Sequence, residues 1–126
     1  MPKIFQRKKT VIAVEPHPSI IQAWKKNRSL NNCDFHIVEA ACWDSTESVE
    51  MTLELGSDTG DTFVTSGDVK VPTVLIDDLS VRFGHPKIIK MDIRGLEADA
   101  IFGSAQNIER GNMDVIVEFD PKLSGR

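Results

Sequence analysis

One stretch, residues 87–104, changes its hydrophobic period in the middle and limits what the chain can fold into. The first half is an apolar run rich in β-branched residues, which is typical of a buried strand. Its apolar members are Ile88, Ile89, Met91 and Ile93. After Gly95 the apolar residues follow helical spacing, as Leu96, Ala100, Ile101, Ala105 and Ile108. The stretch therefore predicts a strand, a tight turn and a helix.

Asp92 stands at the junction between these two patterns. In open α/β sheets, ligands bind outside the carboxyl ends of the strands. Asp92 is therefore a candidate to face a ligand. Carboxylates at strand ends also commonly cap the turn that follows them, so both roles stay open for Asp92.

The rest of the chain alternates strand and helix patterns in the same way. We expect strands at residues 10–14, 34–42, 49–55, 69–76 (broken at Pro72) and 113–119. Helices are expected from Pro18 to about Asn31, in a short segment after Asp77, and from Leu96 to about Gly111. Residues 1–9 read as a tail and residues 56–68 as a loop. The pattern predicts one α/β domain over residues 10–126, with parallel βαβ units and right-handed crossovers.

Composition removes several classes of function. The chain has 126 residues and a net charge of −4, so a nucleic-acid partner is not expected, because phosphate binding favours a basic surface. No apolar run approaches the roughly 18 residues needed to cross a bilayer, and no signal peptide is recognisable. We therefore expect a cytoplasmic protein without a membrane partner. Cys33 and Cys42 lack metal or redox spacing and are expected to be free thiols.

Glu15 follows the first predicted strand directly and is the second candidate for ligand binding. In doubly wound folds, an acid at the end of an early strand accepts hydrogen bonds from the ribose hydroxyls of a cofactor. The alternative is a solvated carboxylate at a strand end. Spacing alone leaves both roles open.

Two further acids flank the predicted ligand edge. Glu97 lies in the first turn of a predicted helix, where a negative charge is favourable, so a structural role is sufficient by itself. Glu118 is expected within the last strand between apolar neighbours, where a carboxylate is costly unless it is paired or open to a pocket. The three histidines are far apart in the sequence, so no metal site is expected.

Five blocks in order resemble the FkbM-type methyltransferases. They are residues 11–18 (VIAVEPHP), 38–44 (VEAACWD), 71–79 (VPTVLIDDL), 90–97 (KMDIRGLE) and 115–118 (VIVE). Each block alone is weak, but five in this order and spacing, over roughly residues 10–120, make a specific match. The resemblance implies a Rossmann-like, mostly parallel sheet with helices on both faces. It also implies S-adenosylmethionine as cofactor and methylation of a hydroxyl on a sugar or small metabolite.

The resemblance also assigns roles to residues. Glu15 is implied to bind the cofactor ribose, and the block that contains Ala40 and Ala41 to border the adenine. Asp92 and Glu97 are implied to lie at the cofactor and acceptor edge, with Asp92 as the candidate base for the acceptor hydroxyl. We therefore expect Glu15, Ala40, Ala41 and Asp92 to bind cofactor, and Asp92 and Glu97 to serve catalysis.

Two departures from the family pattern leave a second function open. The family begins with a central strand and a glycine loop, whereas residues 1–9 contain no glycine. The last strands of a full sheet are also expected to be missing. Without the first strand, the two halves of the sheet must pair directly, leave a gap, or borrow a strand from another chain. In addition, Arg94 stands where the family usually carries an acid.

The alternative function is accordingly a truncated, catalytically inactive module that acts by binding or association, for example as a homo-oligomer through unpaired sheet edges. A dinucleotide-binding domain is a third, weaker interpretation, because the glycine fingerprint is missing.

Overall fold

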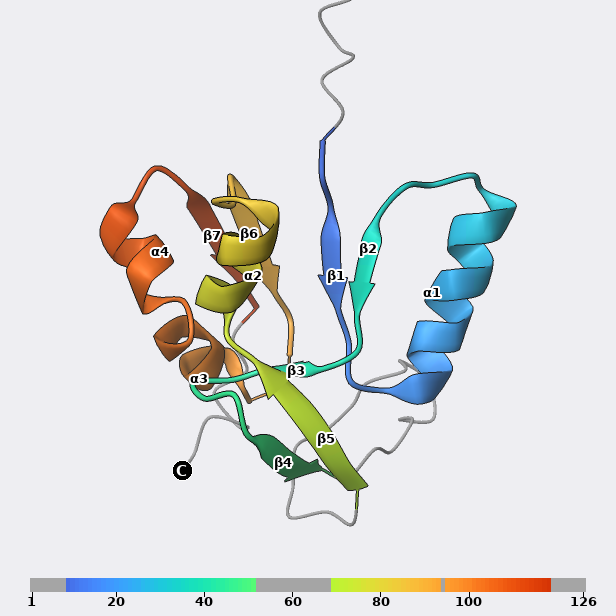
Figure 1. Cartoon of the computed structure of the whole chain (residues 1–126), viewed down its shortest axis with the longest axis horizontal. Coiled ribbons are helices and arrows are strands. Elements are labelled where there is room, and N and C mark those ends of the chain that lie inside the picture. The colour runs from blue at the N-terminus through green and yellow to red at the C-terminus, as the bar shows by residue number, and fades with distance from the viewer. Residues whose placement is uncertain (1–8, 52–68, 94, 119–126) are drawn as a thin grey trace, which may run out of the picture.

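The computed structural model describes residues 9–51, 69–93 and 95–118 and shows an α/β protein with seven strands and four helices. The strands form three small sheets, with the orders β1-β2, β3-β5-β4 and β6-β7 (Figure 1). The predicted α/β class is confirmed. The sequence blocks that suggested βαβ units supply the first and the last of these sheets.

The first unit consists of β1 (Ile12–Val14), α1 (Pro18–Leu30) and β2 (His36–Val38). β1 and β2 are parallel, with Ile12 opposite His36. The helix begins with Pro18 in its first turn, as predicted, because proline has no N–H to leave unpaired there. It ends just before Asn32, which adopts a left-handed conformation with φ of 49°.

The last unit consists of β6 (Ile88–Met91), α3 (Glu97–Phe102), α4 (Ala105–Arg110) and β7 (Asp114–Val117), and its two strands are parallel. The single helix predicted after Leu96 is wrong, because the chain breaks it at Gly103 and Ser104. The carbonyl oxygen of Gly103 accepts the N–H of Asp77 at 2.9 Å, so this bond leads out of the helix to another element.

The middle of the chain departs most from the prediction. β2 and β3 (Ala41–Cys42) were expected to form one strand, but the chain turns after Val38, where the Ala40 N–H donates back to the Val38 carbonyl at 3.1 Å. β3 then pairs in parallel with β5 (Val69–Val74), and β4 (Ser48–Met51) pairs antiparallel on the other side of β5. α2 (Ile76–Phe83) follows at the position predicted for a short helix.

Pro72 does not break β5, contrary to the expectation. It lies opposite Ser48 of β4, and the next bond of the ladder runs from Thr73 N–H to the Glu47 carbonyl at 3.0 Å. The nitrogen of Pro72 therefore points away from β4. On that side β3 begins only opposite Thr73, so no ladder donor is lost at Pro72.

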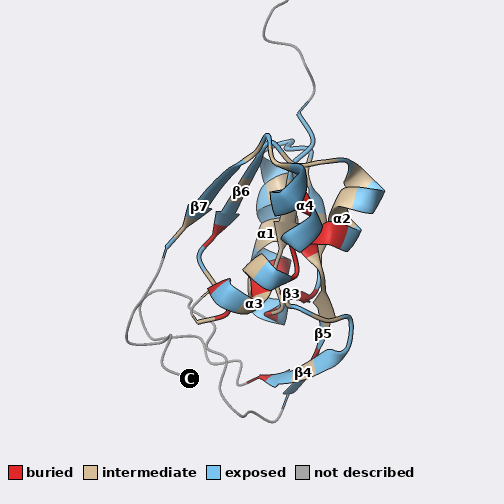
Figure 2. Cartoon of the chain, turned by 90° about the vertical axis from the view of Figure 1, so that its left-hand side faces the viewer, coloured by how far each residue is buried: buried red, intermediate tan, exposed pale blue. Residues whose placement is uncertain are grey.

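Two small apolar clusters hold the elements together. One joins Ala41, Met51, Val71 and Leu96, and the other joins Ile76, Met91 and Ala100. Figure 2 shows the buried residues where α2, α3, β3 and the end of β6 meet, whereas β7 is largely exposed. The core thus lies beside the turn that follows β6.

β1 and β6 do not pair within the described residues, so the two parallel sheets remain separate. A sheet without its central strand was expected to pair its two halves directly, leave a gap or borrow a strand. Direct pairing of β1 with β6 is excluded for the described residues. Several expectations lie outside the described residues: the tail at residues 1–8, Leu53 and Leu55, the loop at residues 56–68, Arg94, and the chain after Glu118.

Candidate functional site

The strands β1, β2, β6 and β7 all point toward the same edge of the molecule (Figure 1). Glu15 follows β1, Glu39 and Ala40 follow β2, and Asp92 follows β6. The carboxyl ends of the two parallel pairs therefore bring these segments to one edge, which is where an open α/β sheet binds its ligand.

Glu15 is held in place from within its own turn. One carboxylate oxygen, Oε1, accepts the main-chain N–H of His17 at 2.8 Å. Its own N–H continues the ladder by donating to the Val38 carbonyl at 3.0 Å. Within the described residues, Oε2 has no donor, so one oxygen of a fixed carboxylate is left for a ligand.

The environment of Glu15 is partly apolar. Burial raises the pKa of this carboxyl above its ordinary value, and the hydrogen bond from the His17 N–H offsets part of that rise. The carboxylate is half-buried and has one oxygen without a donor among the described residues, so it can accept a hydrogen bond from a polar ligand. A donor such as a hydroxyl would stabilise its charged form.

Asp92 is more open than Glu15. Its side chain is 45% exposed, and its Oδ2 lies 3.7 Å from the Nζ of Lys90. An ion pair of this length between exposed groups contributes little to stability. Asp92 is therefore open at the carboxyl end of β6 and does not cap the turn through any hydrogen bond among the described residues.

Glu97 closes the turn that begins at Asp92. Its Oε2 accepts the N–H of Gly95 at 2.9 Å, and only 5% of the residue is exposed. Gly95 has a φ of 96°, a left-handed conformation that favours glycine. Asp92 and Glu97 thus flank one tight turn, whereas Glu15 follows β1 in the other parallel pair.

Ala40 and Ala41 are both buried, with exposed fractions of 6% and 2%. Ala41 packs into the first apolar cluster beside Met51 and Leu96. Its side chain therefore contributes to the core, and any contact of this segment with a cofactor falls to its backbone and to Ala40. Glu39, next to Ala40, forms an ion pair with Lys25 of α1.

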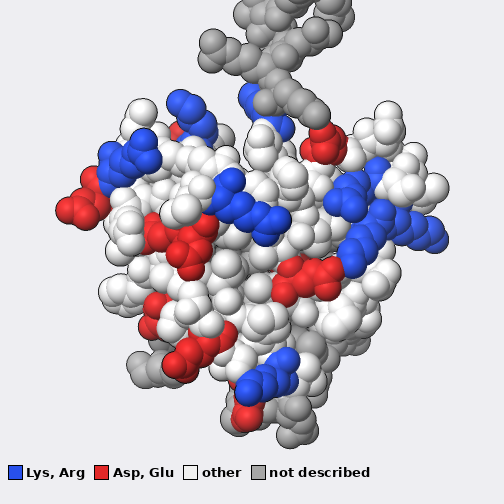
Figure 3. Space-filling view, in the orientation of Figure 1, with Lys and Arg blue, Asp and Glu red and all other residues white. Residues whose placement is uncertain are grey.

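Glu118 lies one residue beyond β7 and is exposed, not enclosed between apolar neighbours. Its N–H extends the β6–β7 ladder by donating to the Met91 carbonyl at 2.9 Å. Figure 3 shows acidic and basic side chains mixed over the face that looks toward the viewer in Figure 1. This face therefore carries no single-sign field of charge.

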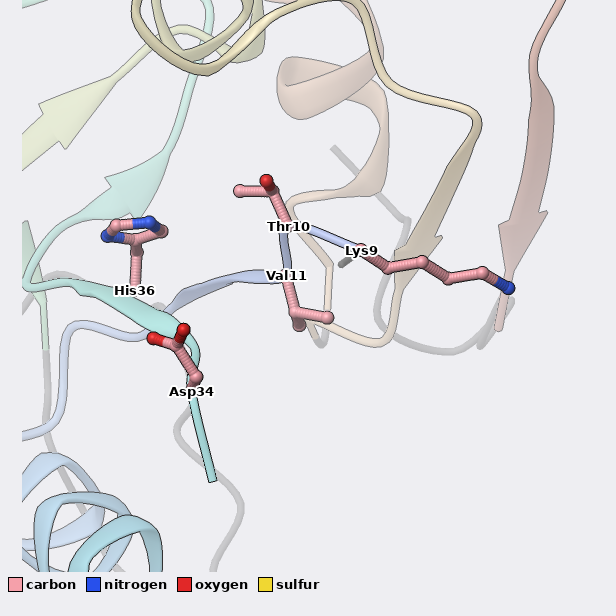
Figure 4. Close-up of a pocket in the computed structure, with 5 residues that line it drawn as sticks. All are labelled: Lys9, Thr10, Val11, Asp34 and His36. Carbon is pink, nitrogen blue, oxygen red and sulfur yellow. The ribbon is translucent and has the colours of Figure 1, made fainter. Parts of the chain in front are cut away.

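A small cavity lies at the opposite edge of the sheet, at the amino ends of β1 and β2. Its lining residues are Lys9, Thr10, Val11, Asp34 and His36 (Figure 4). It holds about 140 Å³, below the roughly 300–1,000 Å³ typical of small-molecule pockets. In Figure 4 the side chain of Lys9 points away from Asp34 and His36, so the charged groups do not converge. We do not assign a ligand to this cavity.

His17 is a residue of the site that the sequence did not reveal. The spacing of the histidines bears only on metal binding, whereas His17 is buried and contacts Glu15 through its backbone. Its position between Pro16 and Pro18, immediately after the candidate acid, was the available signal.

The described part of the chain has neither a metal-binding cluster nor a membrane-spanning helix. It contains no group of three or more His, Cys, Asp or Glu side chains able to hold a metal ion. None of its helices combines the length and the apolar character needed to cross a bilayer.

Comparison with known proteins identifies the family. A family model described as the methyltransferase FkbM domain matches residues 3–124 of the 126-residue chain. No curated protein and no solved structure matches the chain. The family match spans all five sequence blocks and includes the Glu15 and Asp92 strand ends. The chain therefore belongs to the FkbM methyltransferase family.

Proposed function

We propose that this protein is an S-adenosylmethionine-dependent methyltransferase that methylates a hydroxyl of a sugar or small metabolite. The observation that carries the proposal is Glu15, a carboxylate fixed at the end of β1 with one oxygen open. Under this proposal the two parallel pairs are the flanks of one Rossmann-like sheet, with helices on both faces.

The residues present fit the ribose end of the cofactor. Glu15 offers Oε2 directly, and a carboxylate that accepts from a diol forms charge-assisted hydrogen bonds. Ala40, which follows β2, lies at the same edge and leaves its backbone to border the adenine. The cofactor supplies a methyl group on a cationic sulfonium.

The chain's own contribution to the reaction is placement and proton removal. Asp92 is exposed at the end of β6 and takes the proton of the acceptor hydroxyl. Glu97 holds the intervening turn through the Gly95 N–H and so fixes the backbone that carries Asp92. Placing acceptor and methyl donor in line can supply much of the rate acceleration by itself.

Titration calorimetry with S-adenosylmethionine tests the proposal. Wild-type protein should bind the cofactor, and Glu15→Ala should bind it roughly 10- to 100-fold more weakly, because a hydrogen bond to a charged group contributes about 1.5–3 kcal/mol. Glu109→Ala is the matched control, since it removes an exposed carboxylate from α4, away from the strand ends. If the wild type gives no binding heat at millimolar cofactor, the proposal is wrong.

A second function, a catalytically inactive module that acts by association, is favoured by the edges of β1 and β6 that pair with no strand among the described residues. The carbonyl groups of Lys87 and Met91 point toward β7, because they accept the N–H groups of Asp114 and Glu118, respectively, both at 2.9 Å. The N–H and C=O groups of successive residues point to opposite sides of a parallel strand. The N–H and C=O groups of Lys90 therefore point away from β7, to the open side of β6. Such an edge can add a strand from another chain.

Analytical ultracentrifugation over a range of protein concentrations distinguishes the two functions. If the edge associates, the wild type should self-associate, and Lys90→Pro should shift it to monomer because it removes a donor from the open side only. Ile89→Pro is the contrasting variant, because it removes a donor from the β6–β7 ladder and should disrupt the fold. A wild type that is monomeric at every concentration contradicts association between copies.

A further inference from the structure

His17 forms three hydrogen bonds with residues between Glu15 and Ile21. Its N–H donates to Glu15 Oε1 at 2.8 Å, and its carbonyl accepts the Ile21 N–H at 3.0 Å. Its ring nitrogen Nδ1 accepts the Ser19 N–H at 3.1 Å, which makes the imidazole the N-cap of α1. Only 6% of the residue is exposed.

The cap and the carboxylate contact both come from residue 17, one from its ring and the other from its N–H. The backbone of His17 is extended, with φ of −81° and ψ of 118°, as required of a residue that caps a helix. The N–H of the same residue is turned back toward Glu15 and donates to its Oε1. Pro16 and Pro18 on either side have fixed φ angles and leave the turn few alternatives.

The choice of histidine also matters electrostatically. Aspartate is among the most favourable N-cap residues, but at position 17 it would add a second negative charge beside Glu15. The neutral imidazole accepts the Ser19 N–H without adding that charge. The chain therefore caps α1 in a way that leaves Glu15 as the only acid of the turn.

We propose that His17 is a positioning residue for Glu15: its imidazole cap holds the N–H of residue 17 where it fixes Oε1 and leaves Oε2 for a ribose hydroxyl. This inference rests on the proposed function, because it concerns the same ribose contact. His17 itself need not touch the cofactor. It acts through the orientation of the Glu15 carboxylate.

Binding of S-adenosylmethionine to four variants tests this by calorimetry. His17→Ala, which loses the cap, should weaken binding roughly 3- to 30-fold, the range that corresponds to the loss of one N-cap. His17→Asn retains a capping side chain and should bind within about 3-fold of wild type. In a Glu15→Ala background, adding His17→Ala should weaken binding by less than about 2-fold, because the group it positions is gone.

A second experiment needs no ligand: ¹³C NMR of the Glu15 carboxyl during a pH titration measures the pKa of this group. The His17 N–H bond lowers the pKa of this carboxyl, and the charge of the His17 ring lowers it further, so the pKa should be higher in His17→Ala than in wild type and should rise less in His17→Asn, which loses only the ring charge. Circular dichroism confirms that each variant keeps its helices. This measurement tests the contact even where no ligand binds.

The outcomes separate the two claims. If the wild type binds no cofactor, the proposed function is wrong, whatever the titration of Glu15 shows. If the wild type binds and folded His17→Ala binds equally well, the positioning role is wrong while the function stands. The role is equally wrong if His17→Ala weakens binding by the same factor with and without Glu15, or if the Glu15 titration does not move.

Discussion

Gly103 lies directly against the main chain of Trp43. A Cβ atom placed on Gly103 would come within 2.0 Å of the Trp43 carbonyl oxygen. The contact joins the end of α3 to the segment after β3, and the Gly103 carbonyl also accepts the N–H of Asp77. Three segments that are distant in the sequence therefore meet at a position where no side chain fits.

Substituting Gly103 by Ala should destabilise the protein by about 3 kcal/mol or more, because the added methyl group meets a backbone atom and forces the segments apart. Urea unfolding followed by circular dichroism measures the change. Glu109→Ala, on the exposed surface of α4, should change stability by no more than about 0.5 kcal/mol. Equal midpoints for the two variants would show that the approach of Gly103 to Trp43 is not tight.

Asp77 caps a helix that lies nearly thirty residues further along the chain. Its carboxylate accepts the N–H groups of Gln106 and Asn107, both at 3.0 Å, and the side-chain amide of Asn107 at 2.6 Å. The amide oxygen of Asn107 in turn lies 2.9 Å from Nδ1 of His85. The N-terminus of α4 thus depends on an acid from α2.

Asp77→Ala should cost about 2–4 kcal/mol in the free energy of unfolding, because it leaves several donors without their charged acceptor. The neighbouring Asp78 is exposed and provides the matched control. Asp78→Ala should change stability by no more than about 0.5 kcal/mol. Chemical denaturation of both variants measures the difference, and comparable losses would contradict the capping role of Asp77.

Glu15 should make the stability of the protein depend on pH. Burial raises its pKa in the folded state above the ordinary value of 4.5, so over the window between the two values the folded state binds more protons than the unfolded state. Stability contributed by this group therefore falls as pH rises through that window. Above it, the charged carboxylate remains a net cost to folding.

Glu15→Gln should consequently be more stable than wild type at neutral pH, and the gain should disappear in acid below the unfolded pKa. Thermal unfolding across this pH range gives the measurement. Glu109→Gln serves as control at an exposed site. A gain that persists unchanged in acid would mean that the ionisation of Glu15 is not responsible.

The two free cysteines should differ in reactivity. Cys33 is exposed, whereas burial raises the pKa of the Cys42 thiol to about 11. At pH 8 only roughly one Cys42 in a thousand is then the reactive thiolate. Alkylation followed by mass spectrometry should modify Cys33 first, and urea should expose Cys42 to the reagent. Equal rates in the folded protein would contradict the burial of Cys42.

Local sequence patterns determined much of this structure. The β-branched run before Asp92, the Pro18 start of α1 and the Asn32 end of α1 were all predictable, because they depend on neighbouring residues and on backbone preferences. Glu15 and Asp92 were placed at strand ends for the same reason. The ordered blocks also sufficed to identify the family.

Contacts between distant segments decided the rest. No local signal shows that Trp43 approaches Gly103 and that the predicted helix is interrupted there, or that Asp77 caps α4. The sequence placed His17 beside the candidate acid, but only the folded turn joins its helix cap to the Glu15 carboxylate. Local preference fixed many of the points where elements begin and end, whereas hydrogen bonds and close packing across the fold decided which groups meet and where the predicted helix after Leu96 is interrupted.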